Sequence, residues 1–241
     1  MNNSKTWLIV GAGGGIGRAL LDIVINDPTT HRVFATHRQP VSSTLPILDW
    51  LLLDFDDTAT IDHFEAALSA TSIPIDYFVC CSGLLRDQQL TPEKRLADLS
   101  VTAIARSCQI NAGGPLATFA AAAKHLARAP APSISFLSAQ VGSIADNGTG
   151  GWYSYRMAKA ALNMGVKCVS IECARWRNAP VVLAIHPGTT LTELSKPFTR
   201  RRKIPPRTSL ETATLLHKTV QSTTPQQTGS FLTADGQPLP W

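Results

Sequence analysis

Long hydrophobic runs are missing from this 241-residue sequence, and no stretch of about 18 apolar residues could form a membrane-spanning helix. The first residues lack the charged, apolar and cleavage segments of a secretory signal peptide. Internal repeats, low-complexity segments and a domain boundary are also absent. With 44% hydrophobic residues, the chain can fill one large core. We therefore expect a single cytoplasmic globular domain over residues 1–241, without a membrane partner.

Cysteine is scarce, and the five cysteines form no regular framework. An odd number of thiols fits a reduced, intracellular protein better than a disulfide scaffold. No Cys/His spacing resembles a zinc site, so we expect no metal. The adjacent pair Cys80 and Cys81 could be a redox pair, but its place at the end of an apolar run favours small buried side chains.

The net charge of +5 comes largely from Arg200 to Lys203 and from Arg207. A solvated loop is the interpretation that we prefer. A nucleic-acid patch or a rim that attracts acidic ligands are the alternatives. Because no aromatic residues are interleaved and no nucleic-acid motif accompanies the run, we expect no nucleic-acid partner.

The N-terminal region reads as a strand, a glycine turn and a helix. Residues 6–10 are apolar and β-prone, Gly11 to Gly17 hold five glycines, and residues 18–25 have helical spacing. Glycines let the backbone approach a pyrophosphate, and the following helix N-terminus offers free N–H groups to the phosphates. The spacing is G-x-x-x-G-x-G, at Gly11, Gly15 and Gly17, rather than the more common G-x-G-x-x-G. The context favours dinucleotide binding over a merely flexible turn.

The second strand, residues 32–38, indicates which dinucleotide binds. In a dinucleotide fold the end of this strand meets the adenine ribose, where an acid would select against a 2′-phosphate. This strand has no acid and ends at Arg38, whose guanidinium suits a phosphate. We therefore predict NADP(H) rather than NAD(H) as the cofactor. The alternative is that Arg38 points to solvent.

Strands and helices alternate along the rest of the chain, which predicts an α/β fold: one doubly wound parallel sheet, a Rossmann fold of about seven strands with helices on both faces. At its strand ends we expect Asp54 to accept from the adenine amino group and Gly83 to line the cofactor. A polar loop over residues 195–208 contains three prolines and is a candidate substrate lid. The further strands are expected at 49–54, 76–83, 133–138, 180–186 and 229–233, and the further helices at 58–68, 101–124, 153–177 and 209–221.

Tyr155 and Lys159 are four residues apart in the helix expected from residue 153, so they share one face. A nearby cation favours the phenolate, which predicts a tyrosine pKa lowered from about 10 and a side chain able to transfer protons. Tyr-x-x-x-Lys pairs also occur on solvated helices. This pair indicates proton transfer only because a cofactor site is expected elsewhere in the chain. In the preceding helix, Asn111 costs helix propensity, which suggests a hydrogen-bonding role.

Together these residues resemble the short-chain dehydrogenase/reductase family over nearly the whole chain. The features that match are the cofactor-binding glycine turn with Gly11, Gly15, Ile16 and Gly17, then Asp54, Asn111, the Tyr155–Lys159 pair, and the nicotinamide-side loop, Pro187-Gly188 with Thr190 or Thr192. More narrowly, residues 142–156 look like the C-factor-like branch, whose members are carbonyl reductases or proteins of uncertain substrate.

The resemblance implies an NADPH-dependent carbonyl reductase that transfers hydride between nicotinamide and a small carbonyl or alcohol. Tyr155 would be the acid/base. Lys159 would lower its pKa and hold the nicotinamide ribose. Asn111 would hold a water that relays protons from Lys159. The resemblance also implies a homodimer or homotetramer formed through the helices that carry Asn111 and Tyr155.

Two departures from the family pattern matter. Cys80 to Gly83 replace the usual Asn-Asn-Ala-Gly, and Ala139 stands where the catalytic serine is expected. That serine normally holds the substrate carbonyl. Ser138 is our choice to replace it, with Ser143 as the alternative and a backbone-bonded, structural Ser138 also possible. Ala139 motivates a second hypothesis, an NADP(H)-binding sensor or signalling protein with little turnover.

Overall fold

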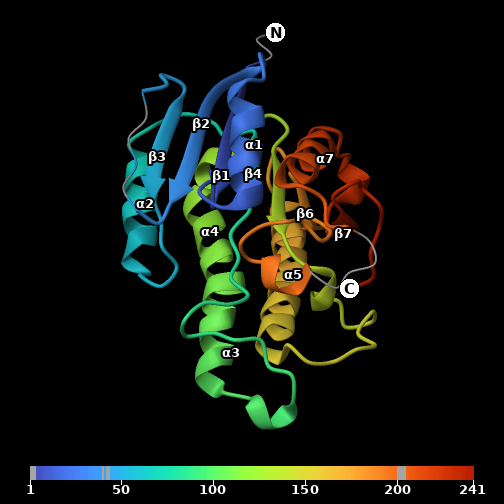
Figure 1. The fold of residues 1–241 in the computed structure, drawn as a ribbon. Coiled ribbons are helices and arrows are strands. Elements are labelled where there is room, and N and C mark those ends of the chain that lie inside the picture. The colour runs from blue at the N-terminus through green and yellow to red at the C-terminus, as the bar shows by residue number, and fades with distance from the viewer. Residues whose placement is uncertain (1–3, 40, 42–43, 200–204) are drawn as a thin grey trace.

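A computed structural model describes residues 4–39, 41, 44–199 and 205–241. Seven parallel strands form one sheet in the order β3-β2-β1-β4-β5-β6-β7, as expected for a doubly wound fold (Figure 1). The strands are β1 (Lys5–Val10), β2 (Thr30–His37), β3 (Leu48–Leu52), β4 (Tyr77–Cys80), β5 (Ser133–Leu137), β6 (Val181–His186) and β7 (Ser230–Thr233).

Helices cover both faces of the sheet, because successive strand residues point to opposite sides. Leu8 and Val10 of β1 belong to the core under α2 (Ala59–Ser69), α4 (Gly114–Leu126) and α5 (Tyr153–Cys173). Trp7 and Ile9 belong to the opposite core under α1 (Gly15–Ile25) and α7 (Ser209–Gln221). Strands buried on both faces read as continuous apolar runs, which is why β1 was visible in the sequence.

The strand order reverses between β1 and β4, which pair from Trp7↔Tyr77 to Val10↔Cys80. In parallel sheets the crevice beyond the carboxyl ends of the strands at such a point receives the ligand. The turn after β1 and the loop after β4 therefore flank the position where a cofactor is expected.

The helix expected over residues 101–124 is interrupted by a wide turn. It consists of α3 (Val101–Cys108), a π-helical turn over Gln109–Gly113, and α4. Pro115 explains the change, because it lacks the N–H that would bond to the carbonyl four residues earlier, and its ring crowds that carbonyl. That carbonyl belongs to Asn111, so the widened turn is centred on the predicted site residue.

Shorter helices complete the fold: 3₁₀ turns at Leu96–Asp98, Gln140–Gly142 and Pro225–Gln227, and α6 (Lys196–Thr199). The predicted lid over 195–208 therefore begins with a helix, and its residues 200–204 lie outside the described residues, as does the basic run from Arg200 to Lys203. Within the described ranges, no helix has the length and apolar character that crossing a membrane requires.

Candidate active site

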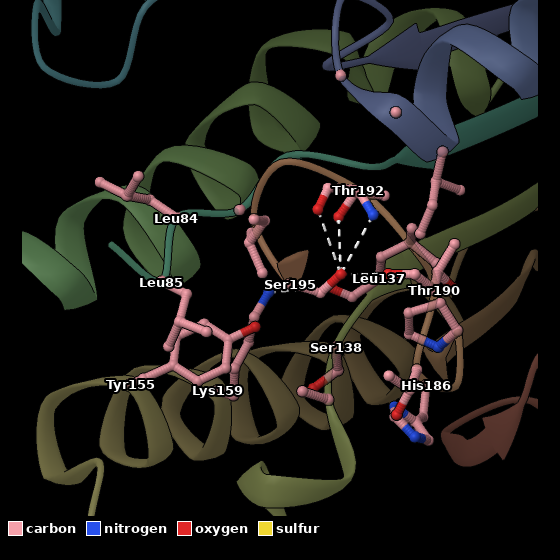
Figure 2. A pocket seen from close by; sticks show the side chains of 18 of the residues that line it. Leu84, Leu85, Leu137, Ser138, Tyr155, Lys159, His186, Thr190, Thr192 and Ser195 are labelled. Carbon is pink, nitrogen blue, oxygen red and sulfur yellow. Dashed lines mark hydrogen bonds between the residues drawn. The ribbon is translucent and has the colours of Figure 1, made fainter. Parts of the chain in front are cut away.

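One cleft of about 1130 Å³ lies at the carboxyl ends of the strands. Four segments far apart in sequence line it, namely residues 13–16, 81–86, 137–141 and 186–195. Tyr155 and Lys159 project into it from α5, while Ser138 follows β5 and Thr190 to Ser195 follow β6 (Figure 2). The cleft thus joins the predicted cofactor turn to the predicted proton-transfer pair.

The glycine turn presents backbone to the cleft. Gly15 and Ile16, two of the predicted cofactor-binding residues, line it together with Gly13 and Gly14. Gly11 and Gly17 instead shape the turn: Gly11 has a φ of +80°, and a Cβ at Gly17 would lie 2.3 Å from the Gly11 carbonyl oxygen. Only glycine permits that approach of α1 to the turn.

The first turn of α1 has no acidic residue and no side-chain cap at Gly14. Its N–H groups and the positive end of the helix dipole therefore face the cleft with no side-chain anion already bound. That combination is suited to phosphate oxygens.

The two predicted adenosine-side residues lie differently. Arg38 is exposed and lines the cleft just beyond β2. Asp54 is not among the residues that line it; its carboxylate accepts a hydrogen bond from the Asp56 amide at 3.1 Å, within the turn after β3. A role for Asp54 toward adenine stays a prediction.

Tyr155 and Lys159 are both buried, with 8% and 2% of their surface exposed. The ammonium nitrogen of Lys159 lies 5.9 Å from the centre of the Tyr155 ring and donates a hydrogen bond of 2.9 Å to the Leu137 carbonyl. Burial raises the pKa of Tyr155 and lowers the pKa of Lys159 to about 8. The expected lowering of the tyrosine pKa is therefore wrong for this arrangement, because removal of the phenol from water disfavours the charged phenolate.

Asn111 is fully buried and does not line the cleft. Its amide fixes the loop after β4, since Oδ1 accepts from the Leu84 amide at 2.9 Å and Nδ2 donates to the Leu84 carbonyl at 2.8 Å. A second Nδ2 bond of 3.1 Å goes to the Ser107 carbonyl. Both amide hydrogens are thus used, and Oδ1 keeps one lone pair.

Gly83, predicted to line the cofactor, does line the cleft and brings Asn111 and Lys159 together. A Cβ at Gly83 would lie 3.3 Å from Asn111 Oδ1 and 3.6 Å from Lys159 Nζ. The missing side chain therefore leaves a small space between an acceptor and an ammonium group.

The hydroxyls of the two candidate serines, Ser138 and Ser143, are both engaged in hydrogen bonds within the protein. Ser138 lines the cleft, but its hydroxyl donates to Asn163 Oδ1 at 2.6 Å. Ser143 lies outside the cleft lining, and its hydroxyl donates to the Trp241 carbonyl at 3.1 Å. Ala139 lines the cleft at the position expected for the serine and offers no hydroxyl.

The loop after β6 closes the opposite wall. Pro187, Gly188 and Thr190 line the cleft, and their contact with a cofactor stays a prediction. The Thr190 hydroxyl lies 2.8 Å from that of Thr212 on α7, and the backbone of Arg207 pairs with the loop on both sides of Thr190. Ser195 accepts from the Thr192 amide at 3.1 Å (Figure 2). It also donates to the Thr190 carbonyl. These contacts hold the loop in place along the cleft.

Arg156 also lines the cleft, although no motif in the sequence indicates a role for it. Its guanidinium donates to the Gly151 carbonyl at 3.0 Å and to the Val141 carbonyl at 3.2 Å, and so holds the loop before α5. The position of Arg156 next to Tyr155 is the one feature of the sequence that could have indicated this role. The hydrogen-bond partners of its guanidinium are backbone carbonyls, which a residue pattern does not reveal.

Comparisons with known proteins agree with this geometry. The model of the family described as short chain dehydrogenase matches residues 5–203. The 1-hydroxy-2-glutathionyl-2-methyl-3-butene dehydrogenase of Rhodococcus sp. (strain AD45) is 29% identical over 189 residues, 78% of each chain. The C-signal protein of Myxococcus xanthus is 30% identical over 146 residues, 61% of this chain and 83% of that one.

Among solved structures, the NADPH-bound carbonyl reductase from chicken fatty liver superimposes with a TM-score of 0.86 at 23% identity, covering 99% of this chain and 94% of that one. At that identity the likeness concerns the fold. The family match over most of the chain carries more weight, and the C-signal match agrees with the C-factor-like branch expected from residues 142–156. The chain belongs to the short-chain dehydrogenase/reductase family of oxidoreductases.

Proposed function

We propose that this protein is an NADPH-dependent carbonyl reductase that acts on a small ketone, aldehyde or quinone. The observation that carries the proposal is the meeting, in one cleft, of an uncapped glycine turn, Arg38 and the buried pair Tyr155 and Lys159. Each feature alone is common, whereas their convergence from distant segments supports one dinucleotide reaction.

The cleft fits NADPH on two counts. The backbone N–H groups of the α1 N-terminus suit the pyrophosphate, and the Arg38 guanidinium suits a 2′-phosphate. A Cβ at Gly15 would lie 2.7 Å from Thr192 Cγ2, so the absence of a side chain lets the loop after β6 approach the turn this closely. When bound, NADPH would supply the hydride for the substrate carbon.

Tyr155 acts as the acid in reduction. Burial keeps its phenol protonated near neutral pH, which is the form that donates to a carbonyl oxygen as the carbonyl carbon receives hydride. The product alcohol thus gains one hydride and one proton, and Tyr155 is left as a phenolate. The nearby Lys159 ammonium stabilises that phenolate because opposite charges attract strongly at a buried site.

Tyr155 regains its proton through Lys159. An ammonium with a pKa of about 8 can release a proton near neutral pH more readily than an ordinary lysine. The space at Gly83 is flanked by Lys159 Nζ and Asn111 Oδ1, and a water held there by the free lone pair of Asn111 would return a proton from solvent to Lys159 after Lys159 has given its own to Tyr155. This supports the proton relay expected from the family resemblance.

Purified protein, NADPH and a panel of carbonyl compounds test the proposal by loss of reduced-nicotinamide absorbance. Tyr155→Phe should lower kcat at least about a thousandfold and leave the Kd for NADPH within about threefold, because it removes only the transferable proton. Tyr153→Phe is the matched control, since Tyr153 starts the same helix outside the cleft lining. No turnover with any carbonyl, or full activity in Tyr155→Phe, would refute the assignment.

A second candidate is an NADP(H)-binding sensor with little turnover. The observation in its favour is that Ala139 offers no hydroxyl and Ser138 directs its own to Asn163. The relative named C-signal fits a signalling role for such a protein. Micromolar or tighter NADPH binding without turnover, and a cellular role that survives Tyr155→Phe, would favour this candidate over the reductase.

We further propose that two or four copies associate through α5. Met157, Met164 and Ile171 are spaced by seven residues and are 48%, 65% and 58% exposed, so they form an apolar stripe along one side of the helix. Sedimentation at micromolar concentration should give a dimer or tetramer, and Met164→Glu should shift it toward monomer. Ile144→Glu is the control, because Ile144 is 80% exposed but lies outside the helices. A monomeric wild type would contradict the proposal.

The cytoplasmic location expected from the sequence remains a proposal. All five cysteines are free, which is compatible with a reducing compartment. Fractionation of cells that express the full chain should recover it with cytoplasmic marker enzymes, and recovery with a membrane or secreted fraction would contradict this location.

A further inference from the structure

The helix that carries Tyr155 begins without a cap of its own. Its N-cap residue, Trp152, makes no side-chain cap, whereas Ser100 caps α3 and Thr208 caps α7 from within their own sequences. Trp152 also has a φ of +51°, the only positive φ outside glycine in the described ranges. A bulky residue in this left-handed conformation is strained by about 1 kcal/mol or more. Something else must therefore hold the start of α5.

Glu93 supplies that support from the loop between β4 and α3. Its Oε2 accepts from the Ser154 amide at 3.1 Å and from the Ser154 hydroxyl at 3.0 Å, across 61 residues of sequence. Its backbone carbonyl accepts from the Trp152 amide at 2.6 Å. A carboxylate at this place satisfies free N–H groups of the helix and faces the positive end of its dipole.

The placement of Glu93 is costly for stability alone. The side chain is 4% exposed, and its second oxygen, Oε1, is buried without a hydrogen-bond partner among the described residues. A buried carboxylate with one unpaired oxygen costs free energy that a serine or aspartate cap at residue 152 would avoid. The arrangement is therefore better explained by what it positions than by the stability it gives.

Two parts of the cleft depend on this contact. Tyr155 lies in the first turn of α5, and the Trp152 ring meets it edge to face with centroids 6.4 Å apart. The loop that ends at Glu93 begins at Leu84, which Asn111 holds by two hydrogen bonds. Leu85 and Arg86, between these anchors, line the cleft. Glu93 thus ties the substrate-side loop to the helix turn that holds the catalytic phenol.

We propose that Glu93 is a positioning residue for the reaction. By capping α5 from the loop between β4 and α3, it holds Tyr155 in a fixed position relative to the part of that loop that lines the cleft. This inference rests on the proposed reductase function. The acceptor oxygen of Glu93 is what matters, since it fixes Ser154, one residue before Tyr155. Misplacing a reacting group by about 1 Å can cost about a hundredfold in rate.

The test compares Glu93→Ala, Glu93→Gln and Glu172→Ala, the last removing an exposed glutamate from the other end of the same helix. Glu93→Ala should lower kcat about 10- to 100-fold with the Kd for NADPH unchanged within twofold. Glu93→Gln retains an acceptor oxygen and should restore kcat to within about threefold of wild type. Glu172→Ala should match wild type. Full kcat in Glu93→Ala, or equal loss in Glu93→Gln, would overturn the inference.

Hydrogen exchange of the ligand-free protein provides a readout that needs no turnover. Amides of residues 152–159 should exchange about tenfold faster in Glu93→Ala, and those of Glu172→Ala should be unchanged there. If Glu93→Ala does not fold, Ser154→Ala removes one of the two donors and should lower kcat about 2- to 5-fold; unchanged kcat in that variant would also overturn the inference. Failure of the wild type to reduce any carbonyl would refute the reductase function. Whether Glu93 caps α5 would then be decided by the hydrogen-exchange result alone.

Discussion

The two ends of the cleft are built by different means. At the proposed cofactor end, the turn after β1 offers backbone atoms shaped by glycines that are close together in the sequence. At the proposed proton-transfer end, side chains reach across the fold: Glu93 caps α5, Asn111 fixes Leu84, and Ser138 bonds to Asn163. The first end follows from local backbone geometry, whereas the second exists only once distant segments have folded together.

This difference predicts how each end responds to substitution. Adding even one carbon to the glycine turn should affect binding of the cofactor through steric overlap. Changes at the other end should leave cofactor binding largely intact and act on the chemical step, because they move protons or the groups that carry them. Four substitutions test the division.

The largest effect is expected at Gly17. An alanine Cβ there would lie 2.3 Å from the Gly11 carbonyl oxygen, a distance that forces the turn away from α1. Gly17→Ala should raise the Kd for NADPH about a thousandfold or more, which corresponds to about 4 kcal/mol. Gly148→Ala is the control, because a Cβ at Gly148 would meet nothing within 4 Å. Titration calorimetry that finds near-normal binding in Gly17→Ala would contradict the steric account.

The second largest effect is expected at Lys159, which belongs to the proton-transfer end of the cleft. The unfolded chain keeps this proton up to a pKa near 10.5, whereas the native state releases it at about 8. Between these two pKa values the unfolded state binds more protons than the native state. The free energy of unfolding that is lost by burying the charged Lys159 therefore becomes smaller as the pH rises from about 8 to 10.5. Below pH 8 the penalty is complete, at about 3 kcal/mol for a difference of this size.

Lys159→Met removes that penalty and should be inactive. Urea unfolding of both proteins should show the variant gaining most relative to wild type below pH 8, with the gap narrowing by about 3 kcal/mol by pH 10.5. A gap that stays constant over this range would show that the buried lysine does not titrate there.

Arg38 separates the two nicotinamide cofactors. If its guanidinium meets a 2′-phosphate, Arg38→Ala should raise the Kd for NADPH about 30-fold, or about 2 kcal/mol, and change the Kd for NADH less than about threefold. Arg18→Ala is a matched control, since Arg18 is an exposed cation on α1 that pairs with Asp22 outside the cleft lining. Equal losses for both cofactors would place Arg38 away from the phosphate.

The same division explains what the sequence could predict. The parallel sheet, the glycine turn and the Tyr155–Lys159 spacing follow from short-range periodicity and residue type. The pKa direction of Tyr155 could not be predicted, because it depends on burial that tertiary packing decides. The support from Glu93 was equally hidden, since a polar loop residue gives no sign of a helix 61 residues away. The widened turn at Asn111 was foreseeable in principle from Pro115, which stands four residues later.

The smallest effect is expected at Ser138, and it tests whether the proton-transfer end has a dedicated carbonyl donor. A preorganised donor of this kind is worth about 2.7–4 kcal/mol, or a factor of about 100–1,000 in kcat. The Ser138 hydroxyl already donates to Asn163 at 2.6 Å and must give up that bond to hold a substrate. Ser138→Ala should therefore lower kcat only about tenfold, with NADPH binding unchanged. Ser143→Ala is the control, because its hydroxyl bonds to the Trp241 carbonyl outside the cleft. A loss of several hundredfold in Ser138→Ala would mean that the hydroxyl turns fully toward the substrate in the working enzyme, while a loss confined to Ser143→Ala would mean that the loop before α5 rearranges when substrate binds.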